Sequence, residues 1–245
     1  MDNAHTRLSL AACIRLLHAE GILTYNGHIS VRASEDNHFF IHSLLDPRSD
    51  VLPENIVLLD LDGRVVEATE GRKPPSEFHI HSEIYRHRPD IHAIAHTHSD
   101  AAIAFTLVSD NPLSVMRADA IHWSDGVPVH PDPTRINTSK KGKELCETLG
   151  AKSAVLLRSH GAVIVGSGLL NIFMLAIHFE ENAQAQFLAS KLGELKPLSS
   201  IEIEALKNSS SPEFYVHYAN KIWSYYVSRG QKKGVIPKTW SNKLL

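Results

Sequence analysis

Two histidines separated by one residue, His96 and His98, close an apolar run that begins at Ile91. The run has the composition of a buried β-strand, and alternate side chains on a strand point to the same side of it. The two imidazoles can therefore converge at the carboxyl end of the strand, where α/β proteins gather their ligands. The spacing indicates a functional site. However, His79 and His81 repeat it in a chain with 16 histidines, and a buried, hydrogen-bonded pair would give the same pattern.

Two further side chains complete a possible set of metal ligands. Glu77 stands at the expected start of a helix, and His160 lies in the turn between two apolar segments. Three imidazoles and one carboxylate suit a divalent transition metal, most often Zn²⁺, with bonds of ~2.0–2.2 Å. We therefore predict a metal centre formed by Glu77, His96, His98 and His160. The alternative for Glu77 is a carboxylate that only complements the helix dipole.

The four residues require strands and helices whose ends lie close together. Alternating or continuous apolar runs predict strands, and helical spacing with capping signals predicts helices. Asp62-Gly63 is typical of a hairpin turn, and Ser76 is the expected N-cap of the helix that starts at Glu77. Strands are predicted at residues 28–31, 38–42, 56–61, 65–66, 91–97, 154–157 and 162–165. The first predicted helix ends at Gly21, a second runs from Ser76 to about residue 87, and a third starts at residue 100. Further helices are predicted at 139–149, 169–192 and 212–229.

Hairpins occur alongside strand–helix alternation, and no linker or repeat divides the chain. This pattern predicts a single α/β domain with a mixed sheet over residues 1–230, followed by a short basic tail over 231–245.

Composition excludes several classes of protein. A chain of 245 residues with 43% hydrophobic residues is not disordered, and a net charge of −2 argues against a nucleic-acid or anionic-membrane surface. The longest apolar stretch, 161–177, is shorter than the ~20 residues that a membrane span needs. Two cysteines cannot form a disulfide framework, and the N-terminus does not resemble a signal peptide, so we expect a cytoplasmic protein.

The motifs around these residues resemble the class II aldolase/adducin family from the first helix to about residue 190. They occur in the order Gly71-Arg72-Lys73-Pro74-Pro75-Ser76-Glu77, His81, Tyr85, Arg88-Pro89-Asp90, His96-Thr97-His98-Ser99 and Ser159-His160-Gly161. The resemblance implies that Glu77 and the three histidines hold Zn²⁺ or Mn²⁺, with Fe²⁺ and Co²⁺ as alternatives, and that Glu77 is also the acid/base. It further implies an α/β/α sandwich with a mixed, largely antiparallel sheet, and a homotetramer whose active sites lie between subunits.

Three departures fall in the subsite where aldolases of this family bind phosphate. Gly27-His28 stands in place of Gly-Asn, Pro75-Ser76 in place of Ser-Ser, and Ser43-Leu44-Leu45-Asp46 in place of Pro-Ser-Gly. A proline cannot donate an amide or hydroxyl hydrogen, so the phosphate cradle loses donors. These departures predict a substrate without a phosphate group. Glu77 stands where the family's epimerases have Asp, which argues against an epimerase.

His28 and Arg158 instead resemble the decarboxylase branch of the family, whose members act on hydroxylated aromatic or pyridine carboxylates. Arg158 precedes His160 by two residues and could hold a carboxylate through its planar guanidinium. An ortho-hydroxy carboxylate could chelate the metal, which would act as a Lewis acid. We therefore expect a non-oxidative decarboxylase, a carbon–carbon lyase. Its catalytic residues would be Glu77, His28 and Arg158, and its substrate would contact His28, Ser43, Ser76 and Arg158.

Several alternatives remain open at this point. The protein could be an aldolase that cleaves a sugar or sugar phosphate through a metal-stabilised enediolate. It could also be an adducin-like binding module without chemistry. The proton donor could be His28, a tyrosine or a bound water. Arg158 could be a partner in a structural ion pair, although a functional role is favoured.

Overall fold

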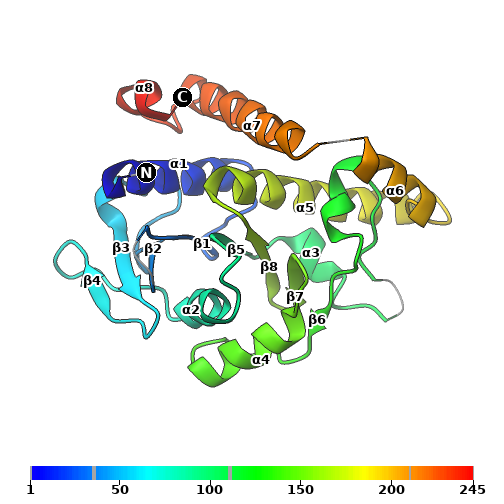
Figure 1. The fold of residues 1–245 in the computed structure, drawn as a ribbon, viewed down its shortest axis with the longest axis horizontal. Helices are drawn as coiled ribbons and strands as arrows, with labels where there is room; N and C mark the ends of the chain where they lie inside the picture. Colours follow the sequence, from blue (N-terminus) through cyan, green and yellow to red (C-terminus); the bar gives the residue numbers. More distant parts are fainter. Residues whose placement is uncertain (1, 35–36, 110–111, 210, 245) are drawn as a thin grey trace.

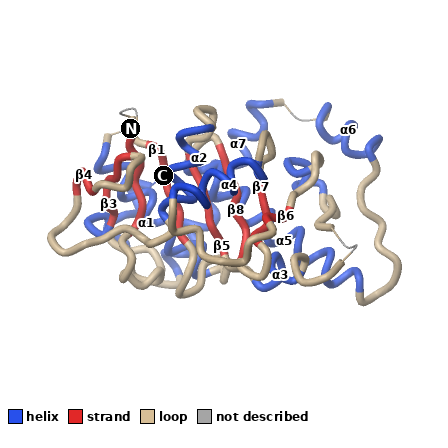
Figure 2. Tube along the Cα trace, turned by 90° about the horizontal axis from the view of Figure 1, so that it is seen from below, coloured by secondary structure: helices blue, strands red, loops and turns tan. Residues whose placement is uncertain are grey.

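The computed structural model describes residues 2–34, 37–109, 112–209 and 211–244. Within these residues, eight strands form one sheet in the order β4-β3-β2-β1-β5-β8-β7-β6 (Figure 1). Neighbouring strands are antiparallel except for β6 and β7, which are parallel. Figure 2 shows the strands ranged from β4 to β6, with α6 beyond β6.

The elements follow one another along the chain much as the sequence predicts. The strands are β1 (His28–Arg32), β2 (His38–His42), β3 (Ile56–Asp60), β4 (Val65–Glu67), β5 (Ala93–Thr97), β6 (Val129–His130), β7 (Ala154–Leu157) and β8 (Gly161–Gly166). The α-helices are α1 (Asn3–Ala19), α2 (Phe78–His87), α3 (Asp100–Ala104), α4 (Ser139–Leu149), α5 (Leu169–Ser190), α6 (Ser200–Asn208), α7 (Pro212–Lys232) and α8 (Ser241–Leu244). Short 3₁₀ segments are η1 (Pro53–Asn55), η2 (Ala118–Trp123) and η3 (Lys238–Trp240).

Helices cover both faces of the sheet, so the predicted α/β sandwich is confirmed. In Figure 1, α1 and α5 lie along one face, α2 and α4 lie along the other, and α7 lies outside α1 and α5. The central strands are therefore buried on both sides and read as continuous apolar runs. Ala95 of β5 belongs to the core under α1 and α5, whereas its neighbour Ile94 belongs to the core over α2 and α4.

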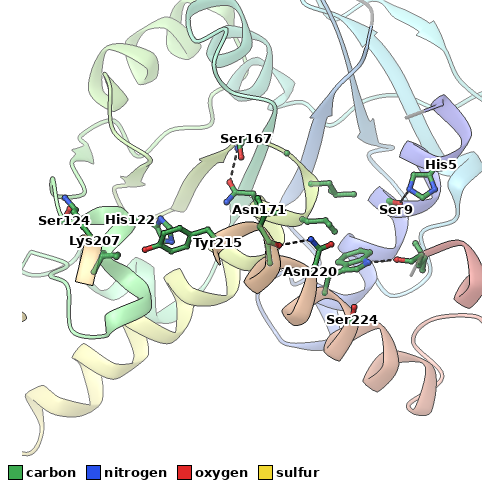
Figure 3. A pocket seen from close by; sticks show the side chains of 18 of the residues that line it. His5, Ser9, His122, Ser124, Ser167, Asn171, Lys207, Tyr215, Asn220 and Ser224 are labelled. Atoms are coloured by element: carbon green, nitrogen blue, oxygen red, sulfur yellow. Dashed lines mark hydrogen bonds between the residues drawn. The ribbon is translucent and has the colours of Figure 1, made fainter. Parts of the chain in front are cut away.

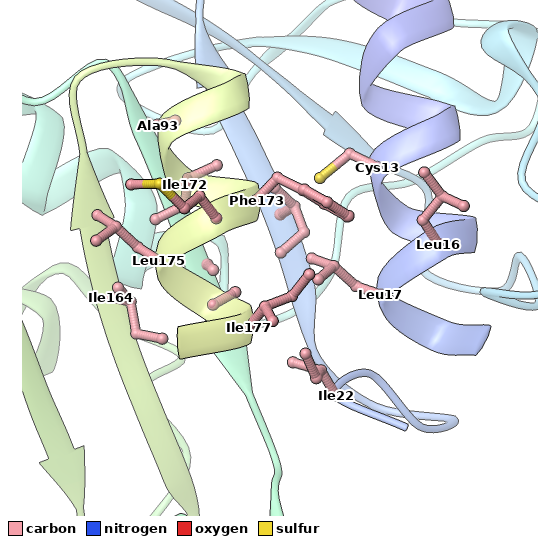
Figure 4. Close-up of a cluster of buried hydrophobic side chains, with 14 of the residues drawn as sticks. Cys13, Leu16, Leu17, Ile22, Ala93, Ile164, Ile172, Phe173, Leu175 and Ile177 are labelled. Carbon is pink, nitrogen blue, oxygen red and sulfur yellow. The ribbon is translucent and has the colours of Figure 1, made fainter. Parts of the chain in front are cut away.

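The core between α1, α5 and the sheet is closely packed. Figure 4 shows Phe173 of α5 facing Cys13 and Leu17 of α1, and all three side chains are completely buried. Burial raises the pKa of the Cys13 thiol above its usual range, so this cysteine acts as a small packing residue. Both Cys13 and Cys146 are free thiols.

Three details differ from the sequence-based prediction or extend it. Helix α2 has Glu77 rather than Ser76 at its N-cap, and the Glu77 side chain makes no capping hydrogen bond. A turn precedes the helix, in which the Phe78 amide donates to the Pro75 carbonyl oxygen (3.1 Å). The sequence pattern missed α6, which buries none of its residues. In the predicted tail, Leu244 is buried and its carbonyl oxygen accepts a hydrogen bond from Trp223 Nε1 (2.9 Å). None of the helices in the described ranges is long and apolar enough to cross a membrane.

Gly161 is required where β8 begins beside the end of β5. A β-carbon at this position would collide with the Thr97 carbonyl oxygen, across the pairing of Thr97 with Ala162. We predict that Gly161→Ala lowers the free energy of unfolding by about 1–3 kcal/mol, measured by urea denaturation. Gly168→Ala is the matched control, since no atom lies within 4 Å of its added carbon. Equal stability of the two variants would contradict the prediction.

Candidate metal centre

The structure brings the four predicted ligands together at one end of the sheet. His96 lies on β5 and His98 follows that strand, while His160 occupies the turn that leads into β8. Antiparallel pairing places the end of β5 beside the start of β8, and Glu77 reaches the same place from the start of α2. One ligand atom from each residue lies within 4.8 Å of the others. No single segment of the chain could supply this set.

The distances suit one small cation. His96 Nε2 and His98 Nε2 are 2.9 Å apart, and Glu77 Oε2 lies 3.7 Å from His160 Nε2 and 4.0 Å from His96 Nε2. Ligands of a tetrahedral Zn²⁺ ion, with bonds of about 2 Å, lie roughly 3.4 Å from each other. The observed separations bracket that value, so the four residues could bind one divalent metal ion.

The hydrogen bonds of the ligands support this interpretation. His96 Nδ1 lies 3.0 Å from the Ala162 carbonyl oxygen, which can only accept, so Nδ1 carries the proton and Nε2 presents its lone pair to the cluster. The second oxygen of Glu77, Oε1, accepts from the Ile136 amide at 3.1 Å. Burial lowers the pKa of His96 well below its usual value. Burial and the neighbouring His160 and Arg48 also lower the pKa of His98 to about 4. Neutral imidazoles are the form that binds metals.

A chain of buried hydrogen bonds reaches the cluster from the side of α2. The Tyr85 hydroxyl is 2.7 Å from Ser30 Oγ, Ser30 Oγ is 2.6 Å from His81 Nδ1, and His81 Nε2 is 2.6 Å from His28 Nδ1. The His28 ring centroid lies 4.8 Å from that of His96. The chain therefore connects Tyr85 with an imidazole that lies against a candidate ligand.

The direction of these hydrogen bonds follows from Tyr85. Among the described residues its buried hydroxyl has one partner, Ser30, so satisfying its proton requires Tyr85 to donate to Ser30. Ser30 then donates to His81 Nδ1, and His81 Nε2 donates to His28 Nδ1. His28 Nδ1 is thus the acceptor, and the proton of the neutral His28 ring is on Nε2. Burial and the nearby histidines lower the pKa of His28 well below its usual value, which keeps the ring neutral.

The predicted substrate residues occupy different environments. His28 and Ser43 are buried, with 4% exposure each, whereas Ser76 and Arg158 are exposed. Ser43 follows β2, two strands from β5 in the sheet. Arg158 stands in the turn that carries His160, and no ion pair holds its guanidinium within the part of the chain that the structure describes.

Two residues that sequence reasoning missed lie beside the centre. His42 is completely buried, and neither ring nitrogen has a hydrogen-bond partner among the described residues. Arg48 is 7% exposed, and its charge contributes to lowering the pKa of His42. No local pattern distinguishes Arg48, because the loop that carries it folds back onto the start of β1. His42 is one of many histidines and has no spacing of its own.

A large cavity lies away from this cluster. A cavity of about 910 Å³ opens between η2, α7 and the start of α5, at the end of β8 away from His160 (Figure 3). Its lining includes Asn171, Tyr215 and Asn220, and none of the four candidate ligands. The metal centre is therefore identified by its donor atoms rather than by the size of its cavity.

Comparison with known proteins agrees with this fold. The sequence model of the class II aldolase and adducin N-terminal domain matches residues 8–187. The chain is 28% identical over 234 residues to the meiotically up-regulated gene 14 protein of Schizosaccharomyces pombe, covering 91% of this chain and 90% of that protein. It is 30% identical over 220 residues to 3,4-dihydroxyphthalate decarboxylase of Arthrobacter keyseri, covering 84% and 88%. The structure of L-fuculose 1-phosphate aldolase from Glaciozyma antarctica superimposes with a TM-score of 0.80 at 25% identity, covering 95% and 91%.

The ligand assignment predicts the effect of removing one imidazole. His98→Ala should lower the affinity for Zn²⁺ or Mn²⁺ by more than about 100-fold, because three donors remain where four converge. Elemental analysis after dialysis and calorimetric titration measure the loss. His92→Ala is the control, since His92 is exposed and lies outside the cluster. Full metal content in His98→Ala would remove His98 from the set.

The hydrogen-bonded chain predicts a change in the His28 ring when Tyr85 loses its hydroxyl. Tyr85→Phe removes the group that sets the direction of the chain, so His28 should become a mixture of its two neutral tautomers. The imidazole ¹⁵N chemical shifts report this ratio, and His28→Gln assigns the signals. The free energy of unfolding should fall by about 1 kcal/mol. Unchanged ¹⁵N shifts in Tyr85→Phe would show that Tyr85 does not orient the chain.

Proposed function

Because this chain belongs to the family of class II aldolases and adducin N-terminal domains, we propose that it is a divalent-metal-dependent lyase. More specifically, we propose a non-oxidative decarboxylase of a hydroxylated aromatic or heteroaromatic carboxylate. The ortho-hydroxy dicarboxylate named in the Arthrobacter relative, 3,4-dihydroxyphthalate, is the model substrate. The metal would be Zn²⁺ or Mn²⁺, held by Glu77, His96, His98 and His160.

The observation that carries this proposal is the buried His28 imidazole beside the metal cluster. His28 occupies the position at which the family's sugar-phosphate aldolases have an asparagine. It therefore offers an imidazole Nε2–H group in place of a carboxamide. A rigid, neutral N–H donor in a water-poor site stabilises negative charge that develops on a bound carboxylate or phenolate oxygen. Pro75, which is two residues before Glu77, is buried and has no amide hydrogen to donate to a phosphate.

When bound, the metal would supply Lewis acidity to the chelated hydroxyl and carboxylate oxygens. Glu77 would take the proton of the ortho-hydroxyl group and later return it to the ring. The bond between ring and carboxylate breaks, CO₂ leaves, and the electron pair stays on the ring carbon. Glu77 then delivers the proton to that carbon, and solvent reprotonates the hydroxyl. One carboxylate is replaced by one hydrogen, and no oxidant is needed.

The remaining predicted residues would position the substrate. A neutral imidazole is a poor acid, so His28 acts in this proposal as a hydrogen-bond donor rather than as the proton source. Arg158 is exposed beside His160, and its free guanidinium could reach a carboxylate at the mouth of the site. Ser43 and Ser76 would add hydroxyl groups from the loops after β2 and before α2.

The family resemblance extends the proposal to a homotetramer with active sites between subunits. Tyr25 and Leu45, on the loops beside His28 and Arg48, are 85% and 87% exposed. Large apolar side chains so exposed on neighbouring loops are consistent with a surface that a second subunit covers.

Aldol cleavage of a sugar phosphate is the second candidate, favoured by the similarity to L-fuculose 1-phosphate aldolase over 95% of this chain. The two reactions use the same metal and the same acid/base. They differ in the bond that breaks and in the products, which separates them in one assay.

We predict that the metal-loaded protein releases CO₂ from 3,4-dihydroxyphthalate and no aldehyde from L-fuculose 1-phosphate. Glu77→Gln should lower the rate of CO₂ release by at least about 100-fold, since it removes the acid/base. His92→Ala should keep the full rate. Release of an aldehyde from L-fuculose 1-phosphate, without release of CO₂ from 3,4-dihydroxyphthalate, would show that the protein is an aldolase. Protein that binds no stoichiometric metal would instead favour a binding module.

A further inference from the structure

Arg48 is a buried cation that forms no ion pair in the described part of the chain, although the nearby Asp46 carboxylate acts to raise its pKa against the lowering effect of burial. Its side chain is nearly inaccessible, with 7% exposure of the residue, and no carboxylate in the described ranges lies within 4.0 Å of it. Nε donates to the Gly27 carbonyl oxygen at 3.1 Å, and Nη1 donates to the carbonyl oxygens of Asp46 at 2.8 Å and Leu44 at 3.5 Å. The Asp46 carboxylate binds Arg72 instead. Burying an unpaired guanidinium is costly, and such groups normally have a partner.

The guanidinium is held at the metal centre. Its acceptor Gly27 precedes His28 and packs against β5 so closely that a β-carbon on Gly27 would lie 2.9 Å from the His96 carbonyl oxygen. The positive charge of Arg48 also contributes to lowering the pKa of two neighbouring histidines, His98 and His42. Arg48 is therefore bound to the segment that carries His28 and packs against β5 at His96.

Part of the guanidinium remains free for a ligand. Nε and Nη1 are fixed by three carbonyl oxygens, whereas Nη2 has no hydrogen bond to any residue that the structure describes. The three carbonyl oxygens are uncharged, so they fix the plane of the guanidinium without neutralising its positive charge. A planar, oriented guanidinium with free N–H groups matches the two oxygens of a carboxylate.

Arg48 also lies on the loop that departs from the family at the phosphate subsite. The residues Ser43 to Asp46 replace the expected Pro-Ser-Gly, and Arg48 follows two residues later. Arg158, the other candidate for carboxylate binding, is exposed and must lose side-chain entropy to bind. The Arg48 side chain is already ordered by folding, so binding a ligand costs it little further entropy. We therefore expect Arg48 to contribute more than Arg158 to discrimination between ligands.

We propose that Arg48 binds a substrate carboxylate that stays on the ring after CO₂ has left, so that the site selects dicarboxylates. This inference rests on the proposed function. For 3,4-dihydroxyphthalate, the carboxylate next to the chelating hydroxyl is lost, and the other one is held by Arg48. The product, 3,4-dihydroxybenzoate, keeps the group that Arg48 recognises.

Binding of two product-like ligands tests the proposal without requiring turnover. Catechol and 3,4-dihydroxybenzoate share the two hydroxyl groups and differ by one carboxylate. Calorimetric titration of the metal-loaded wild type should give the tighter binding to 3,4-dihydroxybenzoate. Arg48→Gln should weaken that ligand by about 10- to 100-fold and leave catechol unchanged, because only the charge-assisted contact is lost. Arg48→Lys should keep part of the preference, since it retains the charge without the planar fork.

Arg32→Gln is the matched control. Arg32 is likewise held by backbone carbonyl oxygens, those of Ile91, Tyr85 and Arg88, but at the opposite end of β1. It should keep the carboxylate preference even if it is less stable. If Arg48→Gln does not fold, Arg48→Lys decides, because a partial loss confined to 3,4-dihydroxybenzoate is still expected.

Three outcomes would overturn the assignment. These are an intact carboxylate preference in a folded Arg48 variant, loss of the preference in Arg158→Gln alone, and stronger Arg48-dependent binding of glycerol 3-phosphate than of 3,4-dihydroxybenzoate. The proposed function fails separately, through the absence of CO₂ release by the wild type. Arg48-dependent carboxylate binding in such a protein would support the Arg48 assignment while the reaction was reassigned.

Discussion

The antiparallel pairing of β5 with β8 is the constraint on which the site depends. It places the end of β5, with His96, beside the start of β8, directly after His160, although the two histidines are far apart in sequence. The strands approach so closely that only glycine fits at residue 161, and the carbonyl oxygen of Ala162 fixes the tautomer of His96. Pairing, ligand placement and ligand protonation thus follow from one interaction between two strands.

Neutral and cationic side chains lie beside this pair of strands. The chain from Tyr85 to His28 orients one imidazole through buried hydrogen bonds, and Arg48 is oriented by three backbone carbonyl oxygens. Neither arrangement includes an ion pair with a carboxylate among the described residues, although Asp46 acts to raise the pKa of Arg48. The site is consequently suited to a substrate that itself carries negative charge, and fixed donors of this kind require little rearrangement when it binds.

The fold and the reaction are decided by different parts of the chain. The sheet and its helices resemble those of proteins whose names include both an aldolase and a decarboxylase. In the proposed function, the differences that bear on substrate choice are on the segment before β1, the loop after β2 and the segment before α2. Each of these segments ends at the metal side of the sheet, where substitutions alter recognition without disturbing the core.

Local sequence patterns predict every described strand except β6, most helices and the four candidate ligands, because apolar periodicity, turn residues and His-x-His spacing act over a few neighbouring residues. They misplace the N-cap of α2 by one residue and miss α6, since side-chain orientation and exposed helices leave weak local patterns. The packing of distant segments, by contrast, brings Arg48 to the Gly27 carbonyl oxygen and links Tyr85 with His28. Those contacts join segments far apart in sequence, and their energies depend on burial and hydrogen-bond geometry that no local pattern encodes.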